Sequence, residues 1–165
     1  MNLFYKLFAK NNRENFDISN LIWSWIGSFL GLFAIAFFHR NFLDDSDLTL
    51  VLSSFGASAV LIYGAINSPL AQPKNLIGGH IISAIIGVFC YKLFGENLLF
   101  AAAIAVSSSI LVMQLTLTLH PPGGATALIA VIVTPQIHDL GYFFVIFPVF
   151  SGALILFLIA FVIYN

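Results

Sequence analysis

Long apolar runs decide what this chain can fold into. Of its 165 residues, 60% are hydrophobic and only 8% are charged, whereas a soluble domain carries about 25% charged residues. A helix needs about 20 predominantly apolar residues to cross the hydrocarbon core of a bilayer. The runs that reach or approach this length are 21–38, 48–66, 76–94, 98–119 and 140–164. We therefore expect an all-α integral membrane protein.

Two connections between these runs are broken by proline and glycine. Residues 67–75 read NSPLAQPKN and lead into Gly-Gly-His at 78–80, and residues 120–127 read HPPGGATA. Broken backbone within a bilayer is tolerated only where protein buries it or where it lines a wet cavity. The run after the second break, 125–134, has about half the length of a full crossing. We expect a bundle of five to six helical segments, and whether this short one spans the membrane stays open.

The two breaks resemble each other. Each follows a run rich in small and hydroxyl residues, and each leads into a Gly-Gly pair and a β-branched apolar run. With an even number of crossings between them, both breaks would face the same side of the membrane. This pattern predicts a parallel internal repeat about an axis along the membrane normal, although composition alone could also produce it.

Charge placement predicts an orientation. Lys6, Lys10 and Arg13 precede the first apolar run, and basic residues collect on the cytoplasmic side of membrane proteins. We expect residues 1–20 to form a cytoplasmic or interfacial tail and residues 21–165 to form the transmembrane domain. The expected location is the inner membrane of a bacterial cell, with the N-terminus in the cytoplasm.

The first run also suggests how it packs. Gly27 and Gly31 form a GxxxG pair, which lets another helix approach closely and is a candidate contact in a homo-oligomer. The run is followed by Asp44, Asp45 and Asp47, and we expect these aspartates in a solvated loop.

The Gly-Gly pairs are expected at helix starts, where unpaired N–H groups and the positive end of the helix dipole favour an anion. Two such starts that face each other would form a site for a small anion, with side-chain donors around it. The candidate substrate-binding residues are His120, Gly123, Gly124, Thr126, Gln72, Lys74, Asn75, Gly78, Gly79 and His80. Lys74 would steer the anion by its charge. Equally, the glycines could be helix-packing contacts and nothing more.

The two intramembrane histidines each allow two interpretations. His120 could shape the break or touch a substrate or proton, and His80 could simply bond a neighbouring helix. No Asp, Glu or Arg lies inside an apolar run, which disfavours a carboxylate proton relay, a sodium site and a catalytic triad. No closely spaced His or Cys pair supports a metal site. We expect no enzymatic activity and no cofactor, and a net charge of -1 suggests no nucleic-acid partner.

The segment HPPGGATAL at 120–128 resembles the signature of the HPP family of integral membrane proteins, and SPLAQPKNLIGGH at 68–80 resembles a second characteristic stretch of that family. The resemblance implies nitrite transport and four membrane-spanning helices, fewer than the apolar runs indicate. We therefore expect transport of a small inorganic anion, with nitrite as the first candidate. The alternatives are a non-transporting membrane scaffold or assembly partner, and a transporter or channel for another small solute.

Overall fold

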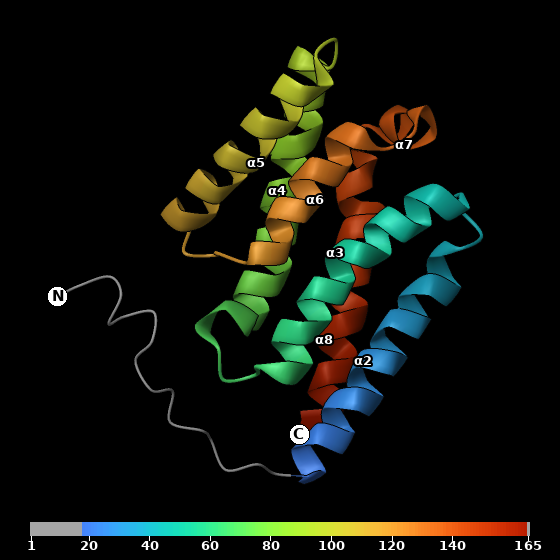
Figure 1. Cartoon of the computed structure of the whole chain (residues 1–165), viewed down its shortest axis with the longest axis vertical. Helices are drawn as coiled ribbons and strands as arrows, with labels where there is room; N and C mark the ends of the chain where they lie inside the picture. The colour runs from blue at the N-terminus through green and yellow to red at the C-terminus, as the bar shows by residue number, and fades with distance from the viewer. Residues whose placement is uncertain (1–17, 165) are drawn as a thin grey trace, which may run out of the picture.

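The computed structural model describes residues 18–164, and within this range every regular element is helical (Figure 1). The tail predicted at residues 1–20 lies almost entirely outside the described residues. In chain order the elements are α2 (Ile18–His39), α3 (Asp45–Gly64), the short 3-10 turn η1 (Pro69–Ala71), α4 (Pro73–Phe94), α5 (Leu98–Leu115), α6 (Pro121–Ile132), α7 (Pro135–Leu140), the wide turn η2 (Val145–Phe150) and α8 (Ser151–Tyr164).

Five helical stretches in the described part of the chain are long and apolar enough to cross a membrane: α2, α3, α4, α5 and the combined η2–α8. They confirm the predicted all-α membrane fold, and their number exceeds the four helices that the resemblance implies. The stretch η2–α8 bends at Phe147 and Pro148, where a kink is expected from the proline. α6 has 12 residues, so at 1.5 Å per residue it is about 18 Å long and covers only part of a hydrocarbon core of roughly 30 Å.

Apart from the short α7, consecutive helices run in alternating directions once α6 is counted: α2, α4 and α6 run one way, and α3, α5 and α8 run the other (Figure 1). The C-terminal end of α8 therefore lies beside the start of α2, and there the hydroxyl of Tyr164 donates to the carbonyl of Tyr63 at 3.0 Å. α4 and α6 run in the same direction, as a parallel repeat requires, but α4 has 22 residues and α6 has 12. The repeat stays a prediction, as do the bacterial inner membrane and the cytoplasmic N-terminus.

The two glycines of α2 are packing contacts within the chain. A Cβ at Gly27 would lie 2.6 Å from a ring carbon of Tyr63 in α3, and a Cβ at Gly31 would lie 2.7 Å from a methyl group of Leu156 in α8. The prediction that this pair faces a second copy is therefore wrong, and the homo-oligomer itself stays a prediction. The other face of α2 carries exposed, stacked rings, among them Trp25 and Phe29 at 5.6 Å, as suits a surface bathed in lipid.

The prediction of a solvated loop is wrong for Asp47. Asp44 is the N-cap of α3, and its carboxylate accepts a hydrogen bond from the backbone N–H of Asp47 at 2.8 Å. The side chain of Asp47 is only 1% exposed and accepts from both the backbone N–H and the hydroxyl of Thr134. A carboxylate can be buried here because Thr134 supplies these donors. The contact ties the start of α3 to the end of α6.

Candidate functional site

The break at residues 116–120 places His120 in the interior of the bundle. α5 ends at Leu115, the chain turns through Leu117 at φ 56°, and α6 begins at Pro121. His120 precedes a proline, which favours extended backbone, and it has φ -139° and ψ 105°. Its side chain does not cap α6. The imidazole is therefore free to point toward α3 and α4.

Small residues allow α6 and this break to press against α4. A Cβ at Gly79 would lie 2.5 Å from the Cβ of His120, and one at Gly123 would lie 2.9 Å from the carbonyl oxygen of Gly79. Two turns farther along α4, a Cβ at Gly87 would meet the Cβ of Ala130 at 2.6 Å. Gly79 and Gly123 thus lie where α4 and α6 cross. The two backbones can approach this closely only because neither residue has a side chain.

The expectation that each Gly-Gly pair opens a helix is wrong for Gly78-Gly79, and in α6 the pair Gly123-Gly124 follows two prolines within the first turn. α4 begins at Pro73, so Gly78 and Gly79 lie in its second turn, where backbone N–H groups are already bonded within the helix. α6 begins with two prolines, which have no N–H, and the N–H of Gly123 donates to the carbonyl of His120 at 2.8 Å. The prolines, rather than the glycines, set both helix starts, because proline is favoured in the first turn.

At this crossing lies a fully buried cluster of hydroxyl and imidazole groups, which we call the histidine cluster: Ser54 and Ser58 from α3, His80 from α4, and His120 and Thr126 from the break and α6. None of these five residues is more than 3% exposed. The hydroxyl oxygen of Ser58 lies 2.8 Å from Nε2 of His80 and 2.9 Å from Nε2 of His120. One serine thereby bridges both imidazoles, which come from segments far apart in the sequence.

The outer nitrogens of the two imidazoles are bonded as well. Nδ1 of His80 lies 2.7 Å from the hydroxyl oxygen of Thr126, and Nδ1 of His120 lies 2.9 Å from the carbonyl oxygen of Leu70 in η1. All four imidazole nitrogens therefore bond to neutral groups. The ring of Phe55 covers His80 at a centroid distance of 4.9 Å. Within residues 18–164 no buried side-chain nitrogen or oxygen lacks a hydrogen-bond partner, so the cluster is stable in a low dielectric.

The predicted site residues fall into groups. His80, His120 and Thr126 meet in the histidine cluster, and Gly79 and Gly123 form the crossing behind it. Gly78 packs against Thr118, whereas Gly124 has only Val106 near it, at 3.9 Å from an added Cβ.

The remaining predicted residues lie at the beginning of α4. The side-chain amide of Asn75 donates to the carbonyl of Leu119 at 2.9 Å and so holds the segment before His120. Gln72 and Lys74 are exposed there and do not reach the cluster. The structure thus brings half of the predicted set together and leaves the rest at or near one end of the bundle.

Three contributors to the cluster are not among the predicted residues: Ser54, Ser58 and the carbonyl of Leu70. Ser54 and Ser58 are four residues apart and share one face of α3, a signal that indicates helix packing but does not distinguish packing from a site. The carbonyl of Leu70 carries no sequence signal, because any residue supplies one. Its position comes from η1, where Ser68 caps the turn by accepting from the N–H of Leu70 at 3.2 Å.

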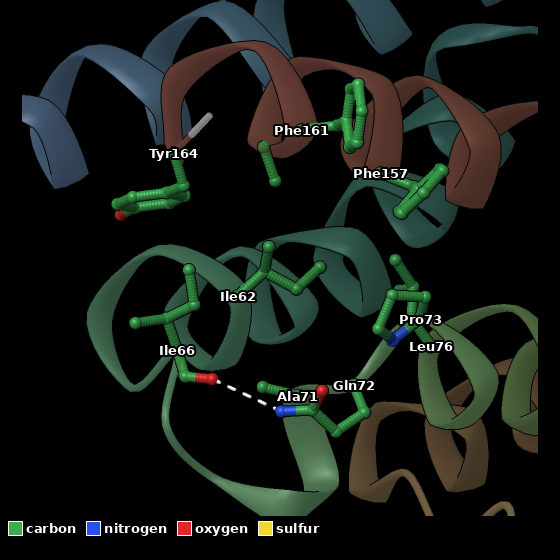
Figure 2. Close-up of a pocket in the computed structure, with 10 residues that line it drawn as sticks. Ile62, Ile66, Ala71, Gln72, Pro73, Leu76, Phe157, Phe161 and Tyr164 are labelled. Carbon is green, nitrogen blue, oxygen red and sulfur yellow. Dashed lines mark hydrogen bonds between the residues drawn. The ribbon is translucent and has the colours of Figure 1, made fainter.

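An apolar cavity of about 200 Å³ lies on the other side of η1, between the ends of α3 and α8 and the start of α4 (Figure 2). Ile62 and Phe157 face it from opposite walls, and Gln72 and Tyr164 add polar groups. Ala71 lines this cavity, and the neighbouring Leu70 holds His120. The turn η1 is therefore part of the partition between the cavity and the histidine cluster.

The other two histidines of the chain lie elsewhere. Nε2 of His39 bonds the hydroxyl of Ser151 at 2.9 Å, which joins α2 to α8. His138 in α7 stacks on Tyr91 at 3.5 Å. Among the described residues, no three His, Cys, Asp or Glu side chains come together as ligands for a metal ion.

Taken together, the alternating apolar helices and the buried polar cluster define a polytopic helical membrane protein. The family model described as the transmembrane region of HPP proteins matches residues 13–165, and the chain belongs to this family.

Two curated relatives are transmembrane proteins of Dictyostelium discoideum, 46% and 43% identical to this chain over 152 residues. Each alignment covers 90% of this chain, and the chain spans about half the length of these relatives, 53% and 49%. No solved structure matches the chain.

Proposed function

We propose that the protein moves a small inorganic anion across the membrane, with nitrite as the first candidate, and that the histidine cluster holds the anion in passage. The single observation that carries the proposal is the bridge of Ser58 between His80 and His120. Hydroxyl groups can turn their protons toward an anion and each neutral imidazole has one N–H to donate, and the imidazoles bond no carboxylate that would repel it. The choice of nitrite rests on the family resemblance.

The predicted site residues take different parts in this proposal. His80, His120 and Thr126 contact the anion together with Ser58. Gly78, Gly79, Gly123 and Gly124 allow the helices to cross closely enough for these side chains to meet. At the end of the bundle where α4 starts, Lys74 attracts the anion through long-range charge, while Gln72 and Asn75 line the approach past η1. In this proposal the protein works in the lipid bilayer as a homo-oligomer.

The cavity beside η1 supports a route to the cluster. It holds about 200 Å³, enough for an anion of three atoms with several waters, and Ala71 in its wall is adjacent in the chain to Leu70, which bonds His120. In this proposal the hydrogen bond between Leu70 and His120 holds the route closed. Passage therefore requires η1 to move, which is the alternating opening expected of a carrier.

The test is uptake of nitrite, nitrate and formate into proteoliposomes that contain the full chain, beside empty liposomes. We expect nitrite uptake above the empty control, and a loss of about tenfold to a hundredfold for His120→Ala, since one lost hydrogen bond to an anion is worth roughly 1.5–3 kcal/mol. Absence of flux for all three anions would contradict the proposal and favour a membrane scaffold, in which the cluster only joins helices.

A further inference from the structure

We propose that Thr126, His80, Ser58 and His120 form a proton relay that ends at the carbonyl of Leu70, so that a proton crosses with the anion. This inference rests on the proposed anion transport and adds its coupling ion. It follows from where the protons of the cluster must lie.

The carbonyl of Leu70 determines which nitrogen of His120 carries the proton. A carbonyl oxygen only accepts, so Nδ1 of His120 carries the proton of that 2.9 Å hydrogen bond. In a neutral imidazole Nε2 is then an acceptor, and the hydroxyl of Ser58 at 2.9 Å is its donor. The other acceptor within reach of this hydroxyl, the carbonyl of Ser54, is farther away at 3.3 Å, and choosing it would leave Nε2 without a donor.

The position of the Ser58 proton determines the positions of the protons on His80 and Thr126. Because Ser58 gives its only proton to His120, it can only accept from His80, whose Nε2 at 2.8 Å must be the protonated nitrogen. Nδ1 of His80 is then bare and accepts from the hydroxyl of Thr126 at 2.7 Å. All four hydrogen bonds therefore point the same way, from Thr126 toward Leu70.

A chain with one polarity can pass a proton by four short transfers. A proton that arrives at the hydroxyl oxygen of Thr126 replaces the one that moves to Nδ1 of His80. His80 passes its Nε2 proton to Ser58, and Ser58 passes its own to Nε2 of His120. His120 is then a cation, and it becomes neutral when its Nδ1 proton leaves to water or to the anion beyond η1. One proton has entered, one has left, and no bond other than O–H and N–H has changed.

The surroundings favour transfer over trapping of the proton. Each imidazole bonds only to neutral groups, and the rings of His80 and His120 lie at 60° to each other with their centroids 5.1 Å apart. The other neighbour of His80 is the ring of Phe55. The carboxylate of Asp47 is seven residues from Ser54, about 10 Å along α3. No fixed negative charge is thus in contact to hold the proton on one histidine.

Loss of the Nδ1 proton from His120, the last transfer, also affects η1. Once Nδ1 of His120 has lost its proton, it and the carbonyl of Leu70 are two acceptors facing each other, and the hydrogen bond that holds η1 is gone. Release of the proton and loosening of η1 are therefore one event. This would link proton movement to opening of the cluster toward the cavity.

The test measures nitrite and protons in the same proteoliposomes at neutral pH, with a pH-sensitive dye inside and empty liposomes as the blank. We expect nitrite entry by the wild type to acidify the interior, and an inward proton gradient to accumulate nitrite above its external concentration. Thr126→Val removes the hydroxyl but keeps the shape, so the acidification per nitrite that enters and the accumulation above the external concentration should both be lost, whatever rate of nitrite entry remains. Thr126→Ser keeps the hydroxyl and should retain accumulation.

Nitrite entry by the wild type without acidification, or full accumulation by Thr126→Val, would overturn the relay and leave transport standing. Absence of any nitrite entry by the wild type would instead overturn the proposed function, and the relay with it. If Thr126→Val is not recovered as a folded protein, judged by elution volume and unfolding temperature, Ser58→Ala interrupts the same chain, and the nitrite that still enters should do so without acidification.

Discussion

His80 and His120 are joined through one hydroxyl group, that of Ser58, which lies 2.8 Å from Nε2 of the first and 2.9 Å from Nε2 of the second. This arrangement fastens α3, α4 and the break before α6 at a single buried point. It also makes Ser58 the residue whose removal should affect both histidines at once.

Ser58→Ala should lower the stability of the protein. The substitution leaves two buried imidazole nitrogens without partners, and an unsatisfied buried polar group costs about 1–3 kcal/mol. The unfolding temperature in detergent should fall accordingly. Ser53→Ala is the matched control, because Ser53 is exposed on the same helix and bonds only the carbonyl of Leu50. Equal unfolding temperatures for the two variants would contradict the described cluster.

Gly123→Ala should be much more harmful than Gly124→Ala. The added methyl group at Gly123 would lie 2.8 Å from the hydroxyl oxygen of Ser83 and 2.9 Å from the backbone of Gly79, whereas at Gly124 the nearest atom is 3.9 Å away. Overpacking of this kind costs about 1–3 kcal/mol. Folded yield and unfolding temperature of these neighbouring variants measure the difference, and the reverse order would show that α6 does not cross α4 as described.

Asp47→Ala should loosen the join between α3 and the end of α6. It removes the acceptor for two donors of Thr134, which we expect to cost roughly 1–3 kcal/mol. Asp45→Ala serves as comparison, since Asp45 is exposed in the first turn of α3 and its interaction with the helix dipole is worth about 0.3–1 kcal/mol. Hydrogen exchange at residues 130–140 should rise for Asp47→Ala alone, and unchanged exchange there would argue against the contact.

His138 should make the protein less stable in acid. Burial against Tyr91 lowers the pKa of His138, an effect larger than the opposing hydrogen bond to Val131 and the charges of Asp47 and Asp139. The folded form therefore binds this proton less readily than the unfolded chain, whose pKa is about 6.5. The stability contribution is complete above that value and is lost as the pH falls below it toward the lower folded pKa.

His138→Phe keeps an aromatic ring beside Tyr91 and removes the titration. The decline in unfolding temperature between neutral and mildly acidic pH should therefore be shallower in this variant than in the wild type. A variant with the same or a steeper decline would assign the acid sensitivity to other groups.

Much of the fold could be predicted from the sequence, because membrane-spanning runs are set by length and composition alone. The ends of the helices could not. Leu115 ends α5 before the apolar run ends, since the chain must turn into the two prolines. The burial of Asp47 was equally hidden, because its partner Thr134 lies far away in sequence and only the folded bundle brings it near.

The site was predicted in part. Choosing His80, His120 and Thr126 was possible because polar residues beside broken backbone in a membrane demand partners. The role expected of the glycines, to supply backbone donors at helix starts, was wrong. A Gly-Gly pair looks the same in sequence at a helix start and at a helix crossing. The bridge of Ser58 required knowing the rotation of α3, which several small residues on more than one face leave undetermined.

The most direct test of the account is the initial rate of nitrite uptake per folded protein in proteoliposomes, for wild type, Ser58→Ala and Ser53→Ala. If the anion passes through the histidine cluster, Ser58→Ala should lose about tenfold or more in rate, while Ser53→Ala, on the exposed face of α3, should match the wild type. Uptake by Ser58→Ala at the wild-type rate would contradict the account and place transport outside the histidine cluster.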